Sequence, residues 1–299
     1  MDRRVLFVGL MFGLMSMCVT PEPVRGAQAP RSSAPDAQQT FLSCTRPGNL
    51  LSEAQTEELE RTSEKMRALK ALQAEGTNAA QHIDRLLPAT TATTQLWSLR
   101  GLATTLSAAA REQLTTAHPE IKAEPLPEVD LVCDDAPMLL DQSRPAAVSE
   151  TTPWNLVVSG AYALSLSRQV TGKGVLISVL APDVPHSHIS LLGRIKHLQK
   201  FGPATRDRSQ DDLMLIHPLG IMAGTHPNQL MGIAPDVSIA LATLPRGKVS
   251  LTDYLNAIQW LMEPAPGQTP AVLFLAVDFS SPAHRLVREL MRSCRLAGI

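Results

Sequence analysis

Three short, uninterrupted apolar runs constrain the fold of this chain more than any other feature. They lie at residues 175–180, 237–243 and 271–277 and are rich in Val, Ile and Leu without alternating polar residues. Strands with this composition are typically buried on both faces, as in a parallel sheet. Helix-like segments at 219–223, 251–261 and 283–296 alternate with the runs. The predicted class is therefore α/β, with a parallel sheet and helices on both of its faces.

A different pattern precedes this region. The spacing of apolar residues predicts helices over 51–72 and 79–87, a strand over 96–106, a helix over 108–116 that begins after Ser107, and an extended segment over 121–132. This order indicates a small α+β unit at 51–132. Residues 27–50, rich in Ala, Pro, Ser and Gln, predict a disordered linker, and the proline-containing residues 133–153 predict a second one before an α/β domain at 154–299.

The first 26 residues have the pattern of a secretory signal peptide. Arg3 and Arg4 precede an apolar run at 5–19, and small residues follow near Gly26. A run of about fifteen residues is too short to span a bilayer as a helix, which takes about twenty. We expect cleavage and a secreted or periplasmic protein with no membrane attachment. A lipoprotein anchored at Cys18 is less favoured, because Met17 stands where a small residue is usual.

Charge and cysteine content exclude several classes of function. The net charge is -1, from 27 basic and 28 acidic residues without a basic stripe, so nucleic acid is not an expected partner. After signal removal three cysteines are left without C-x-x-C spacing, and no metal or other cofactor is expected. In an oxidising compartment Cys44 would pair with Cys133, or these two and Cys294 would all stay unpaired.

Two segments of the α/β region resemble motifs of the subtilisin-like serine proteases, the subtilases. Residues 171–195 read TGKGVLISVLAPDVPHSHISLLGRI, and the family segment usually reads TGKGV-x-VAVLDTGVD-x-x-HP-x-L-x-GRI. Residues 217–237, HPLGIMAGTHPNQLMGIAPDV, resemble the HGTHVAGIIAG segment and the GVAP-x-A that follows it. The structural motif residues that stay in register include Gly172, Gly174, His188, His217, Gly220, Gly224, Gly232 and Pro235.

The upstream unit resembles a subtilase propeptide over residues 94–131, with a Trp-containing strand, a helix, an Ala-His-Pro turn and a final strand. Together the resemblances imply a partial subtilisin-like parallel sheet, preceded by a small α+β propeptide-like unit. They cover most of residues 51–299, in the family's order.

The resemblance also implies that catalysis has been lost. The family uses a Ser nucleophile, a His base, an Asp that orients the His, and an Asn that stabilises the oxyanion. The Asp position is Ala181 and the first His position is Met214, while His217 matches the second, structural His. The family's AAGN and GTSMA segments, which carry the Asn and the Ser, do not occur before Ile299. Because these groups act as a unit, no peptide hydrolysis is expected.

Substitute sites can be drawn, but spacing disfavours them. A relocated triad would use Asp183 with His186, His188 or His217 and with Ser280 or Ser281. Asp183 lies two residues beyond the family's Asp position, several ångströms away, while working sites tolerate about half an ångström. His186 and His188 could also bind a metal, although two close loop histidines are more often solvated. Calcium at Asp211 and Asp212 has no further support.

The leading hypothesis is an exported pseudoprotease that binds a peptide or a protein. A propeptide of this type covers a sheet-edge cleft by strand addition, and that surface survives the loss of catalysis. The partner would be a peptide segment or an active subtilase, which the propeptide-like unit would inhibit or help to fold. Two alternatives stay open: a subtilase-type endopeptidase with a non-standard site, and a truncated gene product without a function.

Overall fold

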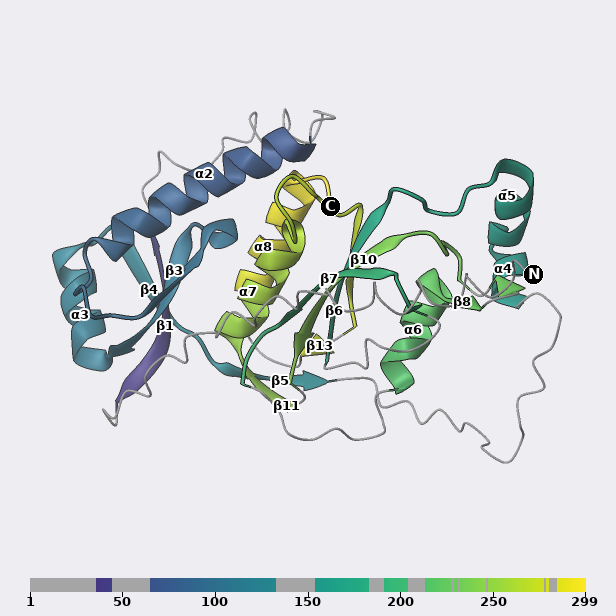
Figure 1. Ribbon diagram of the computed structural model, residues 1–299. Coiled ribbons are helices and arrows are strands. Elements are labelled where there is room, and N and C mark those ends of the chain that lie inside the picture. Colours follow the sequence, from purple (N-terminus) through teal and green to yellow (C-terminus); the bar gives the residue numbers. More distant parts are fainter. Residues whose placement is uncertain are drawn as a thin grey trace, which may run out of the picture. The chain divides into compact units, whose positions relative to one another are not determined.

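The computed structural model describes residues 36–44, 65–132, 154–182, 191–203, 213–226, 229–230, 232–245, 247–276, 278–279 and 284–299. Its N-terminal part, which we call the N-terminal unit, begins with β1 (Ala37–Cys44), α2 (Lys65–Asp84) and β2 (Thr93–Leu96). A 3-10 turn η1 (Trp97–Leu99), β3 (Gly101–Ser107), α3 (Ala108–Ala117) and β4 (Ile121–Pro125) complete it. The four strands form an antiparallel sheet in the order β2-β3-β1-β4 (Figure 1). This β-α-β-β-α-β connectivity is the split βαβ arrangement.

Strand β1 corrects the prediction that residues 27–50 form a disordered linker. Its residues 37–44 pair with both β3 and β4, and Phe41 and Leu42 are almost completely buried. The segment looks like a linker because few of its residues are apolar. Those few point into the core, and pairing with strands about sixty to eighty residues away determines the conformation, as is common for β structure.

Helix α2 is continuous where the sequence predicts two helices separated by residues 73–78. The predicted break reflects Gly76, Thr77 and Asn78, which are weak helix formers. Gly76 is buried, and a Cβ placed on it would lie 1.8 Å from the carbonyl oxygen of Trp97. A glycine is therefore required at this point because the helix and η1 approach each other closely. Helix α3 confirms its prediction, since the Ser107 side chain accepts a hydrogen bond from the Ala110 N–H.

The C-terminal part contains a parallel sheet in the order β12-β6-β10-β7 (Figure 1). The three predicted apolar runs are confirmed as β6 (Leu176–Pro182), β10 (Ser238–Leu244) and β12 (Val272–Leu275). The predicted helices are α6 (Leu213–Ala223), α7 (Leu251–Met262) and α8 (His284–Leu296). Two short helices, α4 (Trp154–Val158) and α5 (Ala161–Arg168), precede β6. The fold class is α/β, as predicted.

Alternate residues of β6 enter two different hydrophobic clusters. Val179 and Ala181 pack with Leu219 and Ala223 from α6 on one face, and Leu180 packs with the cluster that contains α7 on the other. Strand β7 (Ile195–Lys200), an edge strand, was not predicted. Its sequence IKHLQK is largely polar, and most of its side chains are exposed. Charged residues such as these lysines are typical of edge strands, where they prevent pairing with another chain.

One hydrophobic cluster joins the N-terminal unit to the α/β part. It combines side chains of α2, β2 and η1 with side chains of α7 and α8, among them Leu69, Leu72, Leu96, Leu99, Leu255, Ile258, Leu261, Leu286 and Leu290. Burying each side chain of this size is worth roughly 1.5–3 kcal/mol. The N-terminal unit therefore packs as part of the same core.

Cys294 lies in this shared core, and its thiol should not react with alkylating reagents in the native protein. It is 4% exposed, and burial raises the pKa of its thiol to about 12. Because the thiolate is the reactive form, iodoacetamide at pH 8 should leave Cys294 unlabelled in the native protein and label it in urea. Cys44 is also a free thiol but is partly exposed, so it serves as the labelled comparison in peptide mapping. Equal labelling rates at the two sites in the native protein would contradict the burial of Cys294.

Candidate functional site

The parallel sheet has its topological switch point at β6. Strands β10 and β12 flank β6, so the chain crosses over β6 on its way from β10 to β12. In open α/β sheets, ligands bind outside the carboxyl ends of the strands at such a point. The carboxyl ends of β6, β10 and β12 are therefore the first place to look for a functional site.

A strand of the chain itself occupies this place. Strand β11 (Gly247–Ser250) follows the carboxyl end of β10, and β13 (Asp278–Phe279) follows that of β12. Between them lies β5 (Glu128–Val132), antiparallel to both, in a sheet of order β11-β5-β13. We call the space between β11 and β13 the β5 slot. Both edges of β5 are paired, so the slot holds an extended segment mainly through its backbone.

Val129 anchors β5 in the slot. Its backbone is in register with that of Val249, and its side chain is completely buried in the cluster that also contains Val249, Leu251 and Tyr254. Leu126, just before β5, is 4% exposed in the same cluster. The neighbouring Glu128 is exposed, as expected from the alternation of side chains along a strand. The Val129 position of the slot is therefore surrounded by apolar side chains.

Hydrogen bonds connect strand β1 to the C-terminal end of β11, to the start of α7 and to the residue that precedes Pro127 and β5. The Gln39 side-chain oxygen Oε1 accepts hydrogen bonds from Ser250 Oγ at 2.7 Å and from Thr252 Oγ1 at 3.1 Å. The Gln39 carbonyl accepts from the Leu126 N–H at 2.8 Å. Ser250 also caps α7, because its Oγ accepts from the Thr252 N–H at 3.1 Å.

Asp253 is the titratable group in the first turn of α7, close to the end of β11. Burial raises the pKa of its carboxyl above the usual range. A carboxyl whose pKa is raised by folding binds its proton more tightly in the native state. The contribution of Asp253 to the stability of the native state therefore falls as the pH rises from the pKa of this carboxyl in the unfolded chain to its pKa in the folded chain.

The two positions that the sequence resemblance aligns with the subtilase Asp and first His lie on β6 and α6. Ala181 is near the carboxyl end of β6, in register with Thr243 of β10, and is 1% exposed. Met214 and His217 are both in helix α6. An alanine side chain cannot orient an imidazole, and a methionine side chain cannot accept a proton from a serine.

The motif glycines pack tightly around the end of α6. A Cβ on Gly224 would lie 2.4 Å from the carbonyl oxygen of Gly220, and a Cβ on Gly232 would lie 2.5 Å from the backbone nitrogen of Gly224. The Gly232 N–H donates to the Gly224 carbonyl at 2.8 Å. Gly172 has a φ of 80° and approaches the Ala234 side chain, next to the buried Pro235. These residues serve the packing of the α6–β10 connection. Gly174 has a φ of 83° in the turn before β6.

Several predicted site residues lie outside the described residues: Cys133, Asp183, His186, His188, Asp211, Asp212, Ser280 and Ser281. In the described part of the chain, no three His, Cys, Asp or Glu side chains gather as a metal site would require. Within that same part no helix combines the length and the apolar character needed to cross a bilayer.

The sequence did not predict which strands flank β5. Strands β11 and β13 have only four and two residues, too few for a periodic pattern. The signal that could have found β11 is the Ser250 cap of α7, because a short strand ends where that helix begins.

Comparison with known proteins finds similar chains among the solved structures. None of the family models matches the sequence, and no curated protein matches it either. Among solved structures the chain is similar to fervidolysin from Fervidobacterium pennivorans, a keratinolytic enzyme related to subtilisin, with a TM-score of 0.47 and 12% identity. The match covers 88% of this chain and 39% of that chain. The chain thus spans about two fifths of the length of fervidolysin.

Proposed function

We propose that the chain is an exported, non-catalytic relative of the subtilases whose β5 slot binds an extended peptide segment. The observation that carries this proposal is the position of β5, paired on both edges at the carboxyl ends of the parallel strands. In the resting state the slot is filled by the chain's own β5. The ligand would be a peptide strand with an apolar residue at the Val129 position.

The packing of the N-terminal unit favours this role over inhibition or folding of a separate subtilase. Such a role requires the unit to leave its own α/β part and bind another. Here the two parts share a hydrophobic cluster and a buried hydrogen-bonded contact between Ser98 and Gln259. A peptide that exchanges with β5 needs only one strand to move.

Exchange of β5 for a peptide tests the proposal. In the variant Val129→Asp a carboxylate would have to enter the apolar core, so β5 should leave the slot. A fluorescein-labelled peptide of residues 125–132, PLPEVDLV, should then bind at least tenfold more tightly than to the wild type, measured by anisotropy. Val129→Ala, which keeps the site apolar, should give an intermediate affinity. Glu128→Gln changes an exposed residue of the same strand and should behave as the wild type.

The control peptide carries Asp at the Val129 position and should bind to none of the variants. If Val129→Asp and Val129→Ala both stay folded by circular dichroism and bind neither peptide, or bind both equally, the slot is not a peptide site. Casein turnover is measured on the same samples. Turnover that a serine-directed phosphonate blocks would favour the endopeptidase alternative, and we expect none.

A further inference from the structure

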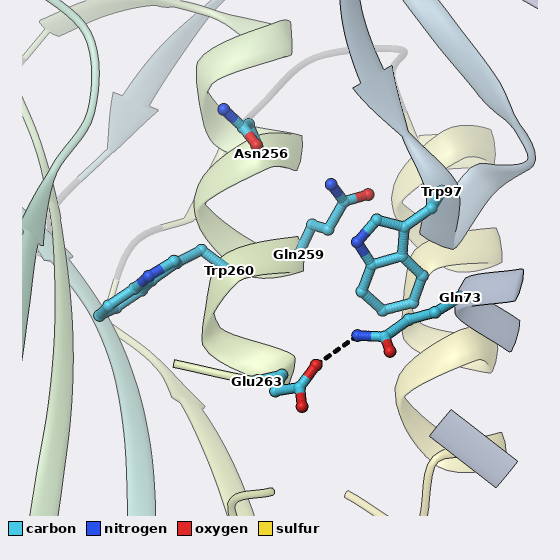
Figure 2. Close-up of a pocket in the computed structure, with 6 residues that line it drawn as sticks. All are labelled: Gln73, Trp97, Asn256, Gln259, Trp260 and Glu263. Atoms are coloured by element: carbon cyan, nitrogen blue, oxygen red, sulfur yellow. Dashed lines mark hydrogen bonds between the residues drawn. The ribbon is translucent and has the colours of Figure 1, made fainter. Parts of the chain in front are cut away.

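A pocket away from the β5 slot lies where the N-terminal unit meets helix α7. Its volume is about 270 Å³. Residues from three elements and one helix cap line it: Gln73 of α2, Trp97 of η1, Asn256, Gln259 and Trp260 of α7, and Glu263, the C-cap of α7 (Figure 2). The three α7 residues follow the spacing i, i+3 and i+4, so they are neighbours on the helix surface.

The pocket carries a negative charge that its lining does not neutralise. Among the described residues that line it, Glu263 is the one ionisable group and none is basic. The carboxylate accepts a hydrogen bond from the Gln73 side-chain amide (Figure 2) and another from the Gly267 N–H, and both donors are neutral. A carboxylate has about four acceptor positions, so it can still bind a donor from a ligand.

Trp97 provides aromatic surface beside this carboxylate, whereas the ring of Trp260 points to the other side of α7 (Figure 2). Trp97 and Trp260 are both partly exposed. Trp260 packs against Phe201 with ring centroids 6.1 Å apart and planes at 59°, which fixes its orientation. Gln259 lies between Trp97 and Trp260 (Figure 2). It accepts hydrogen bonds from Ser98 and donates one to the Gln95 carbonyl, at 3.0 to 3.1 Å. The residues that would contact a ligand are therefore already in place.

We infer that this pocket binds a small organic cation, an alkylammonium or a guanidinium group. Such a cation is attracted by the face of a Trp ring within about 6 Å of its centroid. A carboxylate adds a charge-assisted hydrogen bond or an ion pair. The combination of the Trp97 ring with the Glu263 carboxylate favours a cation over a neutral or anionic ligand. This inference does not depend on the β5 slot.

Tryptophan fluorescence tests the inference directly. The sequence has three tryptophans, so Trp154→Phe leaves the two pocket residues as the reporters. Titration with choline should give a saturable change, whereas 3,3-dimethylbutanol, its neutral analogue of the same shape, should give none. Methylguanidine in a parallel titration distinguishes a guanidinium site from an alkylammonium site.

The matched variants separate charge from shape. Glu263→Gln keeps the shape of the side chain and removes its charge, and it should weaken cation binding about tenfold. Glu112→Gln removes an equal charge from an exposed position of α3 and should leave binding unchanged. Shifts of the Trp97 and Trp260 indole N–H resonances on adding choline would support the site independently. No saturable change with either cation, equal binding of the neutral analogue or of glucose, or unchanged binding by folded Glu263→Gln would each overturn the inference.

Discussion

Replacing Gln259 with leucine should lower the free energy of unfolding by about 3 kcal/mol and loosen the N-terminal unit from α7. Gln259 is 8% exposed and makes three hydrogen bonds across this contact. Its Oε1 accepts from the backbone N–H and the hydroxyl of Ser98, and its Nε2 donates to the Gln95 carbonyl. Leucine has nearly the same size, so packing changes little, but two buried polar groups of Ser98 and the partly buried Gln95 carbonyl lose their partners. Such groups cost about 1–3 kcal/mol each.

Urea denaturation measures this effect, with Gln81→Leu as the matched control. Gln81 is exposed on helix α2, so its substitution should change stability by less than about 0.5 kcal/mol. Ser98→Ala removes one of the donors to Gln259, so the double variant with Gln259→Leu should lose less than the sum of the single losses. A loss below about 1 kcal/mol for Gln259→Leu, or strict additivity, would show that the contact is formed loosely or not at all.

The same buried contact indicates that the N-terminal unit would not separate from the α/β part as a removable propeptide would. Ser293 of α8 donates to the Ser98 carbonyl at 2.7 Å, so Ser98 is bonded to α7 and to α8 together. Arg285 of α8 forms an ion pair with Glu124 of β4. Cleavage in the segment that joins β5 to α4 would break none of these contacts. The unit and the α/β part should therefore stay together after such a cut.

The α/β class could be predicted because its strands carry their own signal. β6 and β10 are largely buried, so their apolar runs stand out locally. β12 carries the same apolar composition, although its side chains stay partly exposed. β1 and β7 carry no such signal. β1 has only Phe41 and Leu42 as large buried residues, and β7 is an edge strand with exposed Lys196 and Lys200. Both become strands through pairing with distant partners, which composition cannot show.

The candidate site was predictable only in outline. Ala181 lies near the carboxyl end of β6, directly after the apolar run that predicts this strand, and the extended segment 121–132 contains β4 and β5. Which strands hold β5 depends on the crossover from β10 over β6 to β12, a property of the whole sheet. The aromatic and acidic pocket likewise joins Gln73, Trp97 and Glu263, which are far apart in the sequence and meet only because α2 and η1 pack against α7.

Gly76→Ala should destabilise the protein by about 2 kcal/mol, against the preference of helices for alanine. Helix propensity alone predicts about 1 kcal/mol of stabilisation, because Gly76 lies in the interior of α2. The added Cβ, however, would lie 1.8 Å from the Trp97 carbonyl oxygen and 2.5 Å from its carbonyl carbon. These are backbone atoms of η1, so α2 must move away from it. That movement would disturb Leu72, Leu96 and the other core side chains between the two elements.

Gly220→Ala is the matched control, since Gly220 is also inside a helix but has nothing within 4 Å of the point where an added Cβ would lie. It should be neutral or stabilising by up to about 1 kcal/mol, so the two substitutions have opposite signs. Thermal and urea unfolding of both variants decide between packing and propensity. If Gly76→Ala were as stable as Gly220→Ala, α2 would not approach η1 this closely, and the pocket that Trp97 and Gln73 line would have a different shape. The cation titration repeated on Gly76→Ala tests whether the α2–η1 contact shapes the pocket. A displaced η1 should weaken cation binding even with Glu263 intact.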